Sequence, residues 1–242
     1  MPELQASSFN QVHVTLADGT SFAGVRGTST GTGKGTITNS FNAVVQVIKD
    51  AGRGAGTFRV RRGFLAFDTS GISGTVNSAT LSLTVSHASP DLPKMAVVRG
   101  TADGSSTAHF DSITGYNSSA TMSGNVTDLA AVPAHDFSSN SSNDTVTISL
   151  NSTARGLMTS QDELYIVLVS YAHDYLLVEP TSGGFFDVGL YGTTHSTTSR
   201  RPHIDYTEVA AGYTHLPLNV AAADINQVNN VASADIHSII DV

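Results

Sequence analysis

The chain has 242 residues, of which 40% are hydrophobic, so it can bury one large core and is long enough for a single β domain with an appendage. Its formal net charge of −8 leaves few cations to neutralise phosphates, and we therefore expect no nucleic-acid binding. The sequence contains no cysteine, which excludes disulfides, thiolate metal sites and cysteine nucleophiles.

Apolar and polar residues alternate in several segments of the chain. Residues 12–16, 58–61 and 79–85 follow a period of two, which predicts strands with one buried and one exposed face. Residues 43–50 could form two helical turns or a strand, and we favour the strand because the segment is rich in β-branched residues. The alternation returns at residues 145–150, which predict a further strand.

Three segments are apolar throughout and predict more fully buried strands. They are residues 64–67, 95–98 and 164–169. The last contains the longest apolar run, which is far shorter than the roughly 20 residues of a membrane-spanning helix, so we expect no membrane span. Turn signals such as residues 68–71 separate the segments. Roughly nine closely spaced strands without long helical patterns predict an all-β sandwich or barrel.

The composition of the chain changes near residue 210. Residues 115–144 are polar and rich in loop signals, and the last clear strand closes at Tyr206. Beyond it the sequence shifts toward alanine and loses its lysines and arginines. We therefore expect a β body over residues 1–209 and a C-terminal tail over residues 210–242.

The tail contains an internal repeat. Residues 223–231 are echoed by residues 234–242, with an aliphatic side chain at every third position of each copy. This spacing predicts a short helical turn per copy, and two copies are too few to bury their own apolar stripe. The stripe should therefore dock on the body, on another subunit or on another protein. The expected anchoring residues are Ile225, Val228, Val231, Ile236, Ile239 and Val242.

Several segments of the body resemble the signature of the DNRLRE-type domain. Residues 61–83 read RRGFLAFDTSGISGTVNSATLSL and are similar to its Phe-Leu-x-Phe-Asp strand, turn and Ser-Ala-x-Leu strand. Residues 200–207, RRPHIDYT, look like its closing Arg-Pro strand, and with residues 146–151 and 164–169 the resemblance spans residues 10–208. It implies a jelly-roll β-sandwich of two antiparallel sheets, found in secreted, surface and phage structural proteins and sometimes able to bind carbohydrate.

The tail resembles a different group of sequences, the short Ala-Asp-Ile repeats of virion proteins from marine and cyanobacterial phages. Those repeats usually close with Asn-Gly-Val, for which residues 229–231 have Asn-Asn-Val and residues 240–242 have Ile-Asp-Val. The resemblance implies that the tail belongs to a virion protein, without the glycine that such repeats use in their turn.

Aromatic and basic side chains are candidates for carbohydrate binding. Sugar rings stack on exposed aromatic platforms, and tryptophan is absent, so tyrosines would have to supply them. A pair of arginines could clamp an anionic sugar, although we expect one of them to pack its stem on the sheet and pair with a carboxylate. The candidate glycan contacts are Tyr171, Tyr175, Tyr191, Arg200 and Arg201, with Tyr116 and Tyr213 as further stacking groups.

No catalytic pattern stands in the sequence. The histidines do not pair at metal-ligand spacing, and His173 and Asp174 resemble isolated loop residues. Residues 31–36 contain a lysine among glycines but lack the Ser or Thr that a phosphate-binding loop places after it. Asp68 follows a buried strand, where it could contribute to a structural calcium site, although we favour a turn-capping role. We expect no enzyme activity and no cofactor other than that calcium ion.

Together these features predict a non-enzymatic structural protein of a phage virion, either a capsid decoration protein or a tail or fibre component. Its expected partners are other virion proteins and further copies of itself, for example in a trimer. The N-terminus lacks the basic and apolar regions of a signal peptide, so we expect the protein in the virion, outside the cell after host lysis. The alternative is a carbohydrate-binding module that recognises a host polysaccharide.

Overall fold

The fold is all-β, as the sequence predicts. The computed structural model describes residues 2–16, 20–50, 57–88, 94–137, 140–181, 183, 185–209, 227–228 and 231–232. Antiparallel strands dominate these residues, and the helices among them are few and short. None of the described helices is long and apolar enough to cross a membrane.

Each segment predicted from alternating or apolar residues corresponds to a strand. β2, β4 and β6 begin three or four residues before the predicted segments, and residues 58–61 and 64–67 belong to one strand, β5. The strands of the body are β1 (Glu3–Gln5), β2 (Ser8–Leu16), β3 (Gly33–Thr36), β4 (Ser40–Lys49), β5 (Phe58–Asp68), β6 (Thr75–Ala88), β7 (Lys94–Arg99), β8 (His135–Asp136), β9 (Thr145–Ser149), β10 (Glu163–Ser170), β11 (Phe185–Tyr191) and β12 (His203–Val209). The helical elements are α1 (Phe22–Arg26), η1 (Thr107–His109), α2 (Ser152–Ser160), η2 (Tyr171–Tyr175) and η3 (Thr198–Arg200).

The described strands of the body form one large antiparallel sheet, whereas the resemblance implies the two antiparallel sheets of a jelly roll. Its order is β1-β12-β6-β11-β4-β5-β10-β7-β8, with β2 and β3 beside β5 and β9 beside β6. β6 makes the sheet continuous because residues 75–84 pair with β12 and β9, whereas residues 85–88 pair with β11. The register shifts within β11 and within β12, and such irregularities let strands bend.

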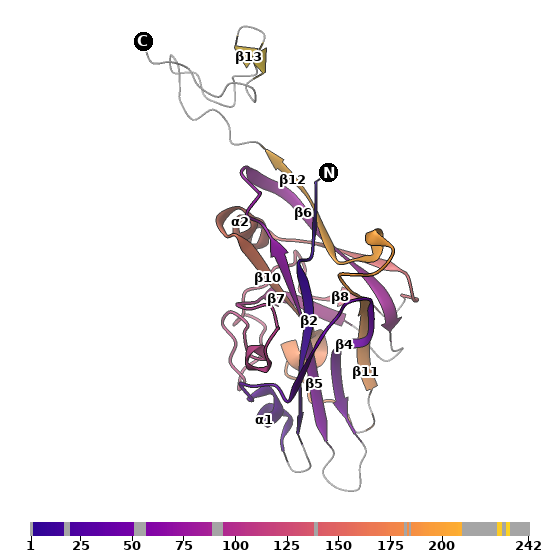
Figure 1. The fold of residues 1–242 in the computed structure, drawn as a ribbon. Helices are drawn as coiled ribbons and strands as arrows, with labels where there is room; N and C mark the ends of the chain where they lie inside the picture. The colour runs from indigo at the N-terminus through magenta and orange to yellow at the C-terminus, as the bar shows by residue number, and fades with distance from the viewer. Residues whose placement is uncertain are drawn as a thin grey trace.

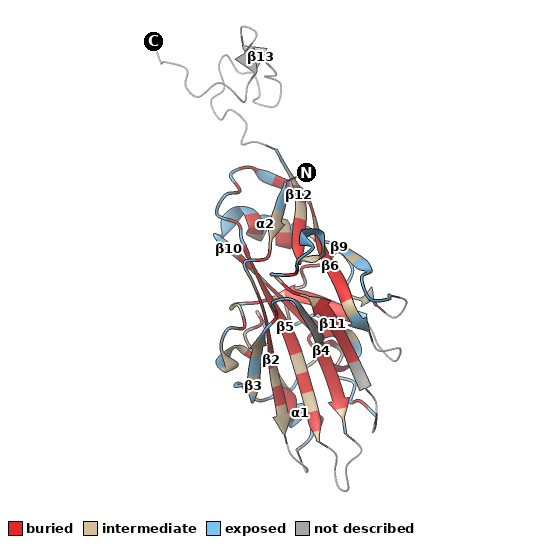
Figure 2. Cartoon of the chain, turned by 45° about the vertical axis from the view of Figure 1, so that its right-hand side comes forward, coloured by how far each residue is buried: buried red, intermediate tan, exposed pale blue. Residues whose placement is uncertain are grey.

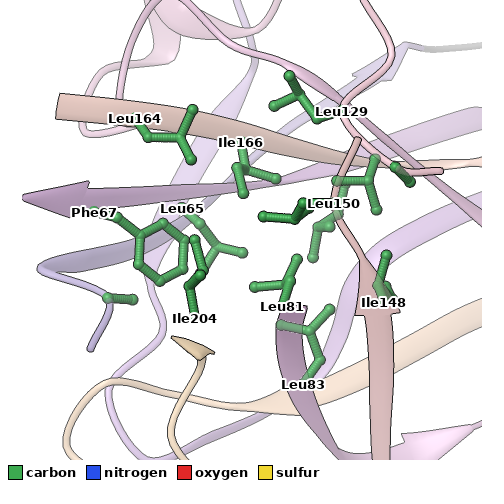
Figure 3. Packing of buried hydrophobic residues seen from close by; sticks show 14 of the residues in the cluster. Leu65, Phe67, Leu81, Leu83, Leu129, Ile148, Leu150, Leu164, Ile166 and Ile204 are labelled. Carbon is green, nitrogen blue, oxygen red and sulfur yellow. The ribbon is translucent and has the colours of Figure 1, made fainter. Parts of the chain in front are cut away.

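The first core lies between two facing parts of this sheet. Figure 3 shows side chains of β6, β9 and β12, such as Leu81 and Ile204, packed against side chains of β5 and β10, such as Leu65 and Ile166. All four are fully buried. The packing of two β layers around an apolar interior is consistent with the predicted β-sandwich, in which each alternating strand buries one face.

A second core covers the other face of β5, β7 and β10. Phe64 of β5, Val98 of β7 and Val167 of β10 belong to one buried cluster with Phe22 of α1 and Phe110, which follows η1. These strands are therefore covered on both faces, which explains why their sequences are apolar throughout. Figure 2 shows the resulting pattern, with buried residues along the strands and exposed residues on the surrounding loops and on α2.

The sequence does not predict α2. Asn151 caps this helix by accepting a hydrogen bond from the Ala154 backbone N–H at 3.0 Å. Ala154 and Met158 are its buried residues, and both join the first core. Two buried positions one turn apart give too weak a helical period to be recognised in the sequence.

Candidate functional site

Three charged side chains lie together in the second core. Arg26 donates from Nε to Asp174 Oδ1 at 2.9 Å, and Arg62 donates from Nε to Asp174 Oδ2 at 2.6 Å and from Nη2 to Oδ1 at 2.9 Å. Each of the three side chains is at most 1% exposed. We refer to Arg26, Arg62 and Asp174 as the arginine–aspartate cluster.

Each member of the cluster comes from a different element. Arg26 is the last residue of α1, which Ser21 caps by accepting from the Gly24 backbone N–H. Arg62 lies in β5, between the residues that pair with β4 and those that pair with β10. Asp174 lies in η2, a single π-helical turn that follows β10 directly. Such turns are rare and are frequent at functional sites.

The cluster holds its charges through ion pairing. Burial by itself would raise the pKa of Asp174, but the adjoining Arg62 and Arg26 guanidinium groups and their hydrogen bonds outweigh it and lower that pKa below its ordinary value. Burial by itself would lower the pKa of Arg62. The interactions with Asp174 and Tyr116 outweigh burial, so the pKa of Arg62 is raised. Asp174 and Arg62 are therefore charged at neutral pH.

Two cations and one anion leave one buried positive charge, and further guanidinium N–H groups donate to backbone oxygens and to a tyrosine hydroxyl. Arg62 also donates from Nη2 to the Tyr116 hydroxyl at 2.8 Å, and that hydroxyl donates to the Arg26 carbonyl oxygen at 2.7 Å. The accepting carbonyl oxygens belong to Phe110, Ser118, Ala120 and Asp174. These bonds tie the loop around residues 110–120 to the sheet.

A polar pocket lies beside the cluster. Its volume is about 310 Å³, and it is lined by Gly27, Asp111, Tyr116, Asn117 and Ser118. The Tyr116 ring lies 4.5 Å from the Arg62 guanidinium carbon, so the cluster fixes one wall of the pocket. A carboxylate, an amide, hydroxyls and an aromatic ring are the groups that recognise sugar hydroxyls and sugar faces.

No protein-family model matches this chain. The comparison with curated proteins likewise finds no match. The resemblance of residues 10–208 to the DNRLRE-type domain and that of the tail to phage repeats therefore remain predictions.

The expected glycan contacts are divided between two regions. Tyr171 and Tyr175 stack in η2 with ring centroids 5.3 Å apart, but Tyr175 is only 2% exposed and donates its hydroxyl to Asp128 Oδ2 at 2.8 Å. Tyr175 is therefore a core residue and offers no stacking face, contrary to the prediction. Burial and the bond to Asp128 raise the pKa of the Tyr175 hydroxyl to about 12.

Tyr191, Arg200 and Arg201 lie together in the second region. The Tyr191 ring lies 4.3 Å from the His195 ring and 5.7 Å from the Arg200 guanidinium carbon. Arg201 donates from Nε to the His195 carbonyl oxygen at 2.8 Å. Within the described residues neither arginine forms the expected ion pair with a carboxylate. Arg200 lies over an aromatic ring, and Arg201 donates to a backbone oxygen.

Asp68 caps a turn, as the favoured interpretation predicts. Its Oδ1 accepts from the Ser70 backbone N–H at 3.0 Å and from the Ser70 hydroxyl at 2.6 Å. These bonds favour the charged carboxylate and lower the pKa of Asp68. The turn thereby uses one of the oxygens that a calcium ion would require.

The arginine–aspartate cluster is not predicted from the sequence. His173 and Asp174 resemble isolated loop residues there, whereas both are buried in η2. One signal was available: Arg61 and Arg62 are neighbours in a strand, so their side chains leave opposite faces of the sheet. Because β5 is covered on both faces, one of these arginines needed a buried acidic partner.

A second group missed by the sequence analysis could hold a metal ion. Glu3 of β1 and His203 and Asp205 of β12 each offer a ligand atom, and these atoms all lie within 4.8 Å of one another. Strand pairing brings them together because Glu3 is opposite Asp205 and Gln5 is opposite His203. Glu3 and His203 are 200 positions apart in the sequence, so local ligand spacing could not reveal the group.

The expected anchoring residues fall mostly outside the described part of the chain. Ile225, Ile236, Ile239 and Val242 lie outside it. Val228 and Val231 belong to β13 (Gln227–Val228) and β14 (Val231–Ala232), which pair antiparallel with these two valines opposite each other. Val228 and Val231 therefore lie in paired strands and not in the predicted helical turn, and the other residues of the first repeat, apart from Gln227, lie outside the described part of the chain.

Proposed function

We propose that this chain is a non-enzymatic structural protein of a phage virion, in which a C-terminal segment attaches a displayed β body. The observation that carries the proposal is that the chain enters and leaves the body at the same end. β1 pairs with β12, with Glu3 opposite Asp205, and β12 ends at Val209. Residues 210–242, with their aliphatic repeat, continue from that end.

The opposite end of the body is formed by other strands. Leu16 of β2 and Lys49 of β4 both pair with Phe58 of β5, far from β1 and from the end of β12 (Figure 1). Attachment through residues 210–242 would direct these strand ends outward, as a capsid decoration protein or a fibre component requires. Docking through the N-terminal segment is the alternative arrangement.

The packing of the body supports a role in display. Without cysteine, its stability must come from packing and polar networks, and β5, β7 and β10 contribute to two cores. The arginine–aspartate cluster adds charge-assisted hydrogen bonds that hold a long loop on one face. A body stabilised in this way can be carried outside the cell, in a homo-oligomer on the particle surface.

The test is deletion of residues 215–242, followed by mass spectrometry of purified particles. We expect the truncated chain to keep its unfolding midpoint and to be missing from the particles. A sharper comparison uses Ile236→Asp and Ile239→Asp, with Ser238→Asp as a control that adds the same charge between them. If the particles contained as much of the truncated chain as of the wild type, attachment through the tail would be excluded.

The polar pocket favours carbohydrate binding as a second candidate function. Asp111, Asn117 and Ser118 offer hydrogen-bonding groups beside the Tyr116 ring in a space of about 310 Å³. This volume lies at the lower end of the range for small-molecule sites. A displayed body with such a pocket could recognise a polysaccharide on the host surface.

A glycan array probed with the full chain tests this candidate. We expect Asp111→Ala to weaken binding by about tenfold, as loss of one charge-assisted hydrogen bond would. Asp162→Ala removes an exposed carboxylate elsewhere and should leave binding unchanged. If the double variant Tyr191→Ala, Arg200→Ala lost binding, the glycan would bind at the second region and not in the pocket. An array without hits would exclude carbohydrate binding.

A further inference from the structure

The group at Glu3, His203 and Asp205 has the chemistry of a metal site. Glu3 and Asp205 are opposite each other in antiparallel strands, and residues two apart in a strand share a face, so His203 projects from the same face. His203 Nε2 lies 3.6 Å from Asp205 Oδ2, and their side chains are 11% and 30% exposed. One imidazole and two carboxylates thus meet at a half-buried edge of the sheet.

A backbone hydrogen bond sets the tautomer of His203. Its Nδ1 lies 2.8 Å from the Arg201 carbonyl oxygen, which can only accept, so Nδ1 carries the proton. In the neutral ring Nε2 then holds the lone pair, and Nε2 is the atom that faces Asp205. Histidines that bind metals are oriented in this way by a bond from the other ring nitrogen.

The two carboxylates lack a cationic partner other than this histidine. Among the described residues, no lysine or arginine forms an ion pair with Glu3 or Asp205. Gln5 donates from its amide to Glu3 Oε1, which orients that carboxylate. The Gln5 Oε1 atom is itself buried and has no hydrogen-bond partner in the described structure. Two anionic ligands and an unsatisfied neutral oxygen favour a dication at this position.

From these observations we propose that Glu3, His203 and Asp205 bind a zinc-type divalent metal ion that links β1 to β12. Imidazole nitrogen suits zinc and its neighbours in the transition series, whereas calcium and magnesium select oxygen ligands alone. Three protein ligands leave a fourth position for water or for the Gln5 amide oxygen. The ion would hold β1, the edge strand of the sheet, at the end of the body where residue 210 follows β12.

Isothermal titration calorimetry of the full chain with zinc chloride tests the proposal. We expect one site, with binding about 100-fold weaker or more in Glu3→Gln and in His203→Gln. His87→Gln is the matched control, because His87 Nε2 lies 3.5 Å from Asp187 Oδ1 in a pair with a single carboxylate. This variant should keep the wild-type affinity, and calcium or magnesium should compete poorly.

Thermal unfolding gives a second measurement. Zinc at about 100 times its dissociation constant should raise the Tm by roughly 5 °C, since it binds only the folded chain. Glu3 is exposed, so Glu3→Gln should fold normally while losing this shift. Absence of zinc uptake by the wild-type chain would overturn the proposal, as would equal uptake by the Glu3, His203 and His87 variants.

Discussion

Asp174 is the acid that joins two buried arginines beside the second core. Among the described residues it is the one acid that contacts both Arg26 and Arg62, and the three side chains are almost completely removed from water. A buried ion pair contributes little net stability when complete, because desolvation offsets the attraction between the charges. Removing the acid from this cluster would leave two buried cations without a counter-charge.

The first prediction concerns the substitution Asp174→Asn. The neutral amide keeps the size of the side chain but not its charge, so we expect a loss of about 3–5 kcal/mol in the free energy of unfolding. Urea unfolding followed by circular dichroism measures this loss. Asp162→Asn, which neutralises an exposed carboxylate, should change stability by no more than about 0.5 kcal/mol. Equal effects of the two substitutions would contradict the role given to the cluster.

The same carboxylate predicts a dependence on pH. Because the pKa of Asp174 is lowered from 3.8, its ionised form stabilises the fold fully above that value, and this contribution is lost as the pH falls through the folded-state pKa. The stability difference between the wild type and Asp174→Asn should be constant from about pH 8 to pH 5 and shrink below about pH 4. Unfolding midpoints of both proteins, measured across this pH range in one buffer series, test the prediction. A difference that stays constant below about pH 4 would contradict it.

At the scale of elements, the local sequence pattern predicts where strands form, whereas long-range pairing decides which strands are neighbours. The alternation in residues 79–85 and the apolar run in 164–169 correspond to β6 and β10. The pattern could not show that β6 belongs to both parts of the sheet, because that depends on its partners β11, β9 and β12. The two side-chain groups at Asp174 and at His203 were missed for the same reason, since their members meet only through tertiary contacts.

The loop that carries Tyr116 allows a prediction at the scale of elements. Gly115 has φ of +80°, and a Cβ there would lie 2.2 Å from the Asn125 carbonyl oxygen. Gly124 in the same loop has φ of +75° with no atom within 4 Å of its Cβ position. Gly124→Ala should therefore cost only the left-handed backbone strain of about 1–2 kcal/mol, whereas Gly115→Ala should cost about 3 kcal/mol or more.

Hydrogen exchange distinguishes the two glycine variants beyond their stabilities. The Met122 backbone N–H donates to the Tyr175 carbonyl oxygen at 2.8 Å, so it reports whether the loop remains seated on η2. We expect faster exchange at this amide in Gly115→Ala than in Gly124→Ala. Similar exchange in both variants would mean that the close approach of Gly115 to Asn125 does not hold the loop.

For the whole molecule, the central strands connect the two cores. Phe64 and Phe67 both lie in β5 and are fully buried, yet Phe64 belongs to the second core and Phe67 to the first. Neither core can lose its packing without exposing a face of the strand that the other core requires. The described body should therefore unfold as one unit, although its layers comprise different elements.

The last prediction compares Phe64→Ala with Phe67→Ala. Each leaves a large cavity in a different core and should lower the free energy of unfolding by about 3–5 kcal/mol. In both variants, circular dichroism, which follows the sheet, and tyrosine fluorescence, to which Tyr116 and Tyr175 of the second core contribute with the other five tyrosines, should give coincident transitions. Val132→Ala, at a side chain that is 54% exposed, controls for loss of an apolar group. If the second core were an independent layer, Phe64→Ala would move part of the fluorescence change to lower urea and leave the circular dichroism transition near its wild-type position.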